Sequence, residues 1–173
     1  MTLQLIETKT LGTAASAIEF TSIPSDGTDL LAVISCRTNR GSEVDGLSLN
    51  LNGSSASFSG RYLEGNGSSV VSATSTVFAG LASGNTTTSN TFGNSLLYIP
   101  NYTGSTNKSF SADAVSENNA TVAGQAIIAG LWSNTAAITS LRIAPLAGTE
   151  LSAGSTISLY KITKGTDGTT VVS

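Results

Sequence analysis

Histidine is absent from the 173-residue chain, and this absence restricts the chemistry that the other residues can perform. Ser-His and Cys-His nucleophiles and most zinc sites require an imidazole. We interpret the single Cys36 as a small buried hydrophobic residue, since it has no partner for an internal disulfide. Glu19, Asp113 and Glu117 are the acids expected in or near strands, where a carboxylate pair can hydrolyse a glycoside. Because no aromatic cluster accompanies them, the sequence predicts no enzyme and no cofactor.

The densest group of charges comprises Arg37, Arg40, Glu43 and Asp45. Arginine and carboxylate side chains at this spacing can form bidentate ion pairs. We interpret the group as an ion-pair cluster that orders a loop, either inside one subunit or between subunits. The alternative is a contact site for an acidic partner or a carbohydrate. The spacing of the acids does not match a calcium loop, so no metal site is predicted.

Aromatic residues are scarce, and Tyr62, Tyr98, Tyr102 and Trp132 are the candidates for ligand or interface contacts. A carbohydrate-binding or receptor-binding module would expose such residues on loops or on one concave face. Trp132 ends an expected strand, where a tryptophan more often belongs to the core or an interface than to a ligand platform. The exposure of these four residues therefore distinguishes a recognition module from a structural protein.

The composition indicates a surface that is polar but carries little charge. Hydrophobic residues make up 39% of the chain and charged residues only 11%, whereas roughly a quarter of average sequence is charged. Such surfaces are typical of proteins packed against copies of themselves. The net charge of −3 and the scattered basic residues argue against nucleic-acid binding. No apolar run is long enough for a membrane helix, and the first residues do not resemble a secretory signal.

Three strands are expected between Val122 and Ile162, with the sequences TVAGQAIIAGLW, AITSLRIAP and STISLYKI. The short connections favour antiparallel neighbours, so we expect a meander. The first of these strands is apolar on both faces, which predicts that both faces are covered. The second cover is either a neighbouring subunit or a long loop of the same chain.

Further strands are expected at 3–11, 16–23, 29–37, 47–51, 57–63, 94–100 and 109–115. Leu47, Leu49 and Leu51 alternate with polar residues and are expected to face inward, and Asn52-Gly53 predicts a hairpin to 57–63. Residues 68–91 have the least ordered pattern. About nine or ten strands predict an antiparallel two-sheet β-sandwich with jelly-roll topology, or a closed barrel as the alternative. We expect one domain at 1–164 and a C-terminal tail at 165–173.

Several segments together resemble the β-rich virion structural proteins of tailed bacteriophages, particularly those of marine and environmental viruses. The resemblance spans roughly Leu3 to Ile162 and rests on these segments: IPSDGTDLLAVISCRTNR, LSLNLNGSSASFSGRYLEGNGSS, NSLLYIPNYTGSTNKSFSADAVSENNAT, IAGLWSNTAAITSLRIAPLAG and STISLYKI. These segments carry no catalytic signature and no active residues that can be transferred.

The resemblance implies a protein displayed on the virion, such as a capsid decoration protein, a head fibre or a short tail appendage. It implies a symmetric homo-oligomer, often a trimer, that contacts the major capsid protein or another virion protein. The sequence lacks a collagen-like or coiled-coil shaft, which favours a compact decoration protein that bridges capsomers. The alternative is a receptor- or carbohydrate-binding module of a tail or head appendage. In both cases the protein is assembled in the host cytoplasm and resides in the virion.

Overall fold

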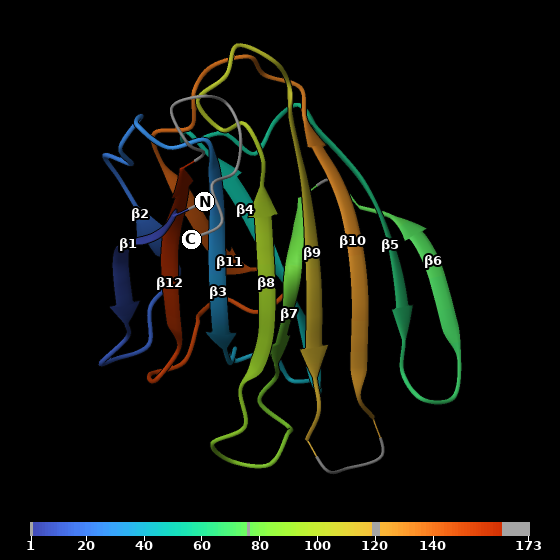
Figure 1. Cartoon of the computed structure of the whole chain (residues 1–173). Coiled ribbons are helices and arrows are strands. Elements are labelled where there is room, and N and C mark those ends of the chain that lie inside the picture. The colour runs from blue at the N-terminus through green and yellow to red at the C-terminus, as the bar shows by residue number, and fades with distance from the viewer. Residues whose placement is uncertain (1, 76, 119–121, 164–173) are drawn as a thin grey trace.

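The computed structural model describes residues 2–75, 77–118 and 122–163, so the predicted tail at 165–173 lies outside the described residues. The described chain consists of strands connected by turns and loops, and none of it forms a helix able to span a membrane. The strands form two antiparallel sheets of eight and four strands, which pack against each other (Figure 1). The predicted all-β, antiparallel two-sheet sandwich is therefore confirmed.

The eight-stranded sheet, called the large sheet below, has the order β1-β12-β3-β8-β9-β10-β5-β6. Its strands are β1 (Thr2–Thr10), β3 (Asp29–Cys36), β5 (Phe58–Gly65), β6 (Val70–Thr74), β8 (Gly93–Ile99), β9 (Lys108–Ser116), β10 (Gly124–Trp132) and β12 (Thr156–Thr163). The four-stranded sheet, called the small sheet, has the order β2-β11-β4-β7. Its strands are β2 (Ile18–Phe20), β4 (Val44–Leu51), β7 (Phe78–Ser83) and β11 (Leu141–Pro145).

The chain alternates between the sheets except from β5 to β6 and from β8 through β9 to β10. Strands β1, β3, β8 and β12 of the large sheet are each followed or preceded by a strand of the small sheet. The hairpins β5–β6 and β9–β10 stay in the large sheet and extend it past β8. Because β7 is the last strand of the small sheet and packs against β8, β9 and β10, the extension reaches beyond it at β5 and β6 (Figure 1).

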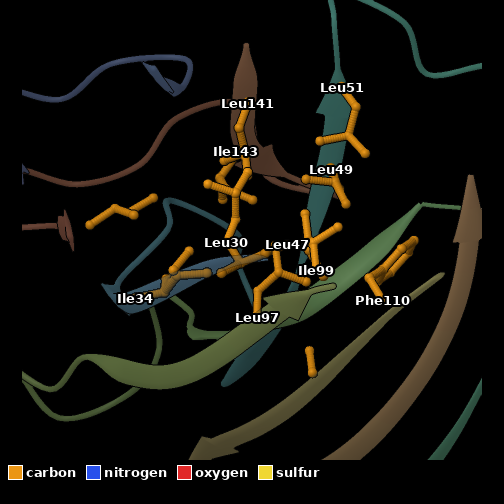
Figure 2. Packing of buried hydrophobic residues seen from close by; sticks show 14 of the residues in the cluster. Leu30, Ile34, Leu47, Leu49, Leu51, Leu97, Ile99, Phe110, Leu141 and Ile143 are labelled. Carbon is orange, nitrogen blue, oxygen red and sulfur yellow. The ribbon is translucent and has the colours of Figure 1, made fainter. Parts of the chain in front are cut away.

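The core lies between the two sheets and is built mainly from branched aliphatic side chains. Leu47, Leu49 and Leu51 of β4 are fully buried, which confirms the inward face predicted from their alternation. Figure 2 shows Leu47 and Leu49 on the side of β4 where Leu97 and Ile99 of β8 lie. Burying one such side chain stabilises the fold by roughly 1.5–3 kcal/mol. The facing strands β4 and β8 therefore hold the sheets together.

The predicted meander at the C-terminal end of the chain is wrong. The three strands form, but β10 pairs with β9 and β5, β11 pairs with β2 and β4, and β12 pairs with β1 and β3. The connections at 133–140 and 146–155 each carry the chain from one sheet to the other. A turn-rich connection of this length can cross the sandwich as readily as it reverses within one sheet.

The turn at Asn52-Gly53 forms, but the predicted hairpin between the strands on either side of it does not. Both residues have the positive φ expected of a tight turn, 52° and 73°. However, β4 and β5 belong to different sheets. The Asn52 side chain binds the crossing segment instead: its Nδ2 donates to the carbonyl of Ala137 and its Oδ1 accepts from Thr139 N, both at 2.8 Å. The turn thus redirects the chain toward the large sheet.

Residues 68–91 are more ordered than their composition predicts. They contain β6 and β7, and every residue of β7 is buried. The apolar island noted in this segment is therefore an interior strand that packs under the large sheet. The strand is only six residues long and is surrounded by Ser, Thr and Gly, which hides it in the sequence.

Candidate functional site

Within the described residues, the thiol and the acids singled out in the sequence lie in separate parts of the fold. No group of metal-ligating side chains occurs among the described residues. Burial raises the pKa of the Cys36 thiol to about 12, so this sulfur is protonated and unreactive at neutral pH. Glu19 lies on β2 of the small sheet, whereas Asp113 is exposed on β9 of the large sheet. These two acids therefore do not form the carboxylate pair that glycoside hydrolysis requires.

The predicted charge cluster divides into separate contacts. The Arg37 guanidinium organises the loop after β7, where it donates to the Thr87 hydroxyl at 2.6 Å. It also donates to the main-chain carbonyls of Asn85, Thr87, Thr88 and Thr91. These bonds are all intramolecular. Arg37 consequently has a loop-ordering role that does not involve the acids of the cluster.

The other members of the cluster surround the start of β4. Arg40 Nη1 lies 3.6 Å from Asp45 Oδ1 and donates to the carbonyl of Val44 at 2.9 Å. The fully buried Asp45 accepts main-chain hydrogen bonds from Ala147 and Gly148. Glu43 Oε2 is buried without a hydrogen-bond partner among the described residues. Within the cluster, Arg40 and Asp45 form an ion pair through a single N–O contact rather than the bidentate pairing that the sequence suggested.

The aromatic candidates occupy different environments. Tyr102 and Trp132 are core residues with 0% and 1% exposure. Tyr102 donates its hydroxyl hydrogen to the carbonyl of Pro24, and Trp132 stacks on Phe58. These two residues do not offer a surface to a ligand.

The remaining two aromatics are more accessible. Tyr62 is half-buried and packs edge-to-face against Phe78 with ring centroids 5.1 Å apart. Tyr98 is exposed on the large sheet and donates to Asp29 Oδ2 at 2.9 Å. Burial and the adjacent Asp29 carboxylate raise the pKa of Tyr98 above its ordinary value. Of the four aromatics, these two can contact a partner.

A cavity of about 350 Å³ lies under β5, beside the small sheet. Tyr62, Glu64 and Arg40 contribute polar groups to its wall, and Phe78 and Leu146 contribute apolar ones. This volume is at the lower end of small-ligand pockets. The cavity combines aromatic, charged and apolar groups in one wall, so it is a candidate site for a small ligand.

The outer face of the large sheet, which the small sheet does not cover, carries exposed apolar side chains. Its first apolar area, called the β3–β8 patch, comprises Leu31, Val33, Leu96 and Tyr98. Leu31 lies opposite Tyr98, and Val33 lies opposite Leu96. Both Val33 and Leu96 are more than two-fifths exposed, at 41% and 47%. Water thus contacts a row of side chains that would normally be buried.

A second apolar area, called the β6 patch, comprises Leu63, Val70 and Ile127. Ile127 on β10 lies opposite Leu63 on β5 and is 62% exposed. These residues line a depression of about 460 Å³ at the end of the sheet. Asp113 of β9 lies between Leu96 and Ile127 in the register and separates the two patches. The outer face therefore offers two apolar patches divided by a polar strand.

The sequence had partly signalled this surface. The apolar character of both faces of β10 predicted a second cover, and the structure leaves Ile127 uncovered by the described chain. No loop among residues 2–75, 77–118 and 122–163 covers Ile127, and cover by a neighbouring subunit is a proposal. The sequence reasoning missed Leu63, Val70 and Leu96. Their signal was an apolar residue at alternate positions where a solvated face would carry charge.

Comparison with known proteins adds no assignment: no protein-family model, curated protein or solved structure matches this chain.

Proposed function

We propose that this protein is a structural component of a tailed-bacteriophage virion, of the capsid decoration type, and that it acts by surface contact. The observation that carries the proposal is the uncovered apolar outer face of the large sheet, with Ile127 62% and Leu96 47% exposed. Contiguous exposed apolar patches mark sites of protein association. In this account the major capsid protein and further copies of the chain cover the outer face.

We further infer that the sandwich is a jelly roll extended by the two hairpins. The alternation of β1, β3, β8 and β12 with β2, β4, β7 and β11 supports this inference, since those eight strands divide equally between the sheets. A jelly roll has eight strands in two sheets. The hairpins β5–β6 and β9–β10 then act as an addition that widens one face of the sandwich.

The proposed mechanism is mechanical. Each subunit lies across the boundary between adjacent capsomers, and its outer face is buried against them. Stable interfaces of this kind bury about 1,200–2,000 Å² in total and are partly apolar. The summed contact area of many subunits then resists the outward pressure of packaged DNA. The low charge of the chain favours such packing, because few charged groups must be desolvated.

The test is binding of the purified chain to expanded capsids of a tailed bacteriophage, followed by co-sedimentation. We expect saturable binding that Leu96→Lys weakens by roughly tenfold or more, because a buried lysine must lose its hydration. Thr21→Lys is the control, since Thr21 is exposed beside β2 of the small sheet. Binding that never saturates, or equal losses in both variants, would contradict the proposal.

A second candidate function is carbohydrate or receptor recognition, and the cavity beside Tyr62 and Glu64 favours it. Carbohydrate sites combine aromatic faces with carboxylates and arginine, and Arg40 also lines this cavity. A glycan array distinguishes the candidates. The recognition account expects a glycan signal that Glu64→Gln removes without loss of thermal stability, whereas the structural account expects no signal from either protein.

A further inference from the structure

The end of the large sheet at β6 is an open strand edge. In the described chain β6 pairs with β5 on one side and with no strand on the other. The pairing register places Ser72 opposite Leu63 and Thr74 opposite Arg61. Open edges present unpaired N–H and C=O groups to any extended chain. The β6 edge is therefore a template for strand addition.

The hydrogen-bond pattern identifies the groups that face outward. Ser75 N donates to the carbonyl of Gly60 at 3.2 Å, and Asn66 N donates to the carbonyl of Ser69 at 3.1 Å. Residues of an antiparallel ladder alternate between bonding their neighbour and pointing away from it. Val70, Ser72 and Thr74 consequently direct their N–H and C=O groups away from β5.

The β6 edge lacks the features that normally prevent strand addition. Its five residues, VVSAT, include no charge and no proline, and its pairing with β5 contains no bulge. Val70 is 70% exposed and Val71 is 49% exposed. Native edges usually carry a lysine, an inward-pointing charge, a proline or a bulge. The absence of each of these from β6 points to an edge that is covered in the working protein.

We propose that the β6 edge pairs, antiparallel and about a two-fold axis at Ser72, with the β6 edge of a second copy of this chain. This inference deepens the proposed function, because it specifies how copies contact one another. In this register Ser72 lies opposite Ser72 of the second copy, and Val70 lies opposite its Thr74. Every outward N–H and C=O group of Val70, Ser72 and Thr74 then has a partner.

The side chains of β6 suit this register. Val70 and Thr74 are both β-branched and share the outer face, and such cross-strand pairs stabilise sheets. Val71 and Ala73 meet on the other face, where a large residue adjoins a small one. The nearest charged residues of the same hairpin, Arg61 and Glu64, lie one strand inside on β5, so like charges do not meet across the new ladder. A second copy therefore fits without repulsion.

The two-fold contact also joins the β6 patches of the two copies into one outer face. A five-residue ladder is short, so the isolated dimer is expected to be weak. Copies already held side by side on a particle would pair more readily because of their high effective concentration. Strand pairing of this kind thus suits a protein that works in an array.

The experiment uses two full-length variants of opposite charge, Ser72→Lys and Ser72→Glu, with sedimentation velocity over a concentration series. We expect the wild-type chain to form dimers. Each variant alone should associate at least roughly tenfold more weakly, because the two-fold axis places like charges together. An equimolar mixture should recover dimers that contain one copy of each variant, measured by native mass spectrometry. Circular dichroism checks that both variants fold.

The outcomes distinguish this inference from the proposed function. Self-association that survives in both variants, or a mixture that does not recover it, overturns the β6 pairing while leaving capsid binding to be judged by its own assay. A wild-type trimer or a chain that stays monomeric also overturns the two-fold pairing.

Discussion

The two edges of the large sheet differ in how they meet solvent. Strand β1 carries Glu7 and Lys9, which form an ion pair at 3.5 Å, and its pairing with β12 shifts register between Leu5 and Glu7. Strand β6 has no charge and no register shift. Inward charges and bulges are devices that keep an edge from pairing. The β1 edge thus has features that prevent further strand pairing, whereas the β6 edge can still pair with another strand.

The Lys9 side chain shows how closely β1 is tied to its own fold. Its ammonium group donates to the carbonyl of Glu19 at 2.7 Å and lies 5.4 Å from the centre of the Phe20 ring. These contacts tie the β1 edge to β2 of the small sheet. Strand β6 lies beyond the small sheet and has no equivalent tie in the contacts described above. The following predictions test this difference between the edges, beginning with the largest expected effect.

Gly130→Ala should remove the support of the β6 edge. Gly130 of β10 lies opposite Phe110 of β9, and a Cβ atom at this position would overlap the Phe110 ring. We expect the free energy of unfolding to fall by about 1–3 kcal/mol, measured by urea titration. Gly65→Ala is the matched control, because nothing lies within 4 Å of the Cβ position there. Equal stability of the two variants would contradict this packing.

Ser72→Pro should abolish dimers and leave the monomer nearly as stable as wild type. Proline removes one N–H donor, and the N–H of Ser72 points away from β5 in the alternation described above. We expect a change in unfolding free energy within about 0.5 kcal/mol. Ala73→Pro provides the control, since it removes a donor that bonds β5 and should lower stability. If Ser72→Pro loses stability but keeps its dimers, the N–H of Ser72 bonds β5 and does not face outward.

Alkaline pH should lower stability through Tyr98, which lies in the part of the large sheet nearer β1 than β6. The raised pKa of Tyr98 means that the folded state holds this proton more tightly than the unfolded chain does. Its contribution to stability is therefore present below the ordinary value of 10 and is lost as the pH rises through the folded pKa. Urea titrations at pH values above 10 should show a steeper loss of stability with pH in wild type than in Tyr98→Phe. Identical pH profiles would contradict the Asp29 contact.

Neutralising the β1 edge should have the smallest effect on association between copies. The Glu7–Lys9 pair is solvent-exposed, so its loss in Glu7→Gln with Lys9→Gln should change the unfolding free energy by less than about 1 kcal/mol. The lost hydrogen bond from Lys9 to the Glu19 carbonyl should add about 1 kcal/mol. The register shift remains, and we expect association to rise only slightly in sedimentation velocity. Strong association of the double variant would show that charge alone protects this edge, and that the bulge contributes little.

Local patterns in the sequence were sufficient to predict every strand except β6 and β7, but not which strands pair with one another. The alternation of Leu47, Leu49 and Leu51 fixes which face is buried, because the side-chain period of a strand is two. The Asn52-Gly53 turn fixes a reversal, but its direction depends on hydrogen bonds from Asn52 to Ala137 and Thr139, which are distant in sequence. The pairing partners of the strands therefore could not be predicted from local sequence patterns.

The exposed outer face of the large sheet was also predictable only in part. The apolar outer side of β10 was visible in the sequence, whereas the position of β6 at the sheet edge depends on the pairing of β5 with β10 across the intervening strands. Tyr102 and Trp132 were aromatic candidates whose burial follows from tertiary packing alone. The Arg37 contacts with the loop at 85–91 likewise require the folded chain.

Amide hydrogen exchange of the two edges at low and high protein concentration tests the account most directly. If β6 is covered by a second copy, the Val70, Ser72 and Thr74 amides should become protected as concentration rises, while the amides of β1 should exchange at an unchanged rate. If the β6 amides exchange equally fast at every concentration, the open edge is not an interface between copies.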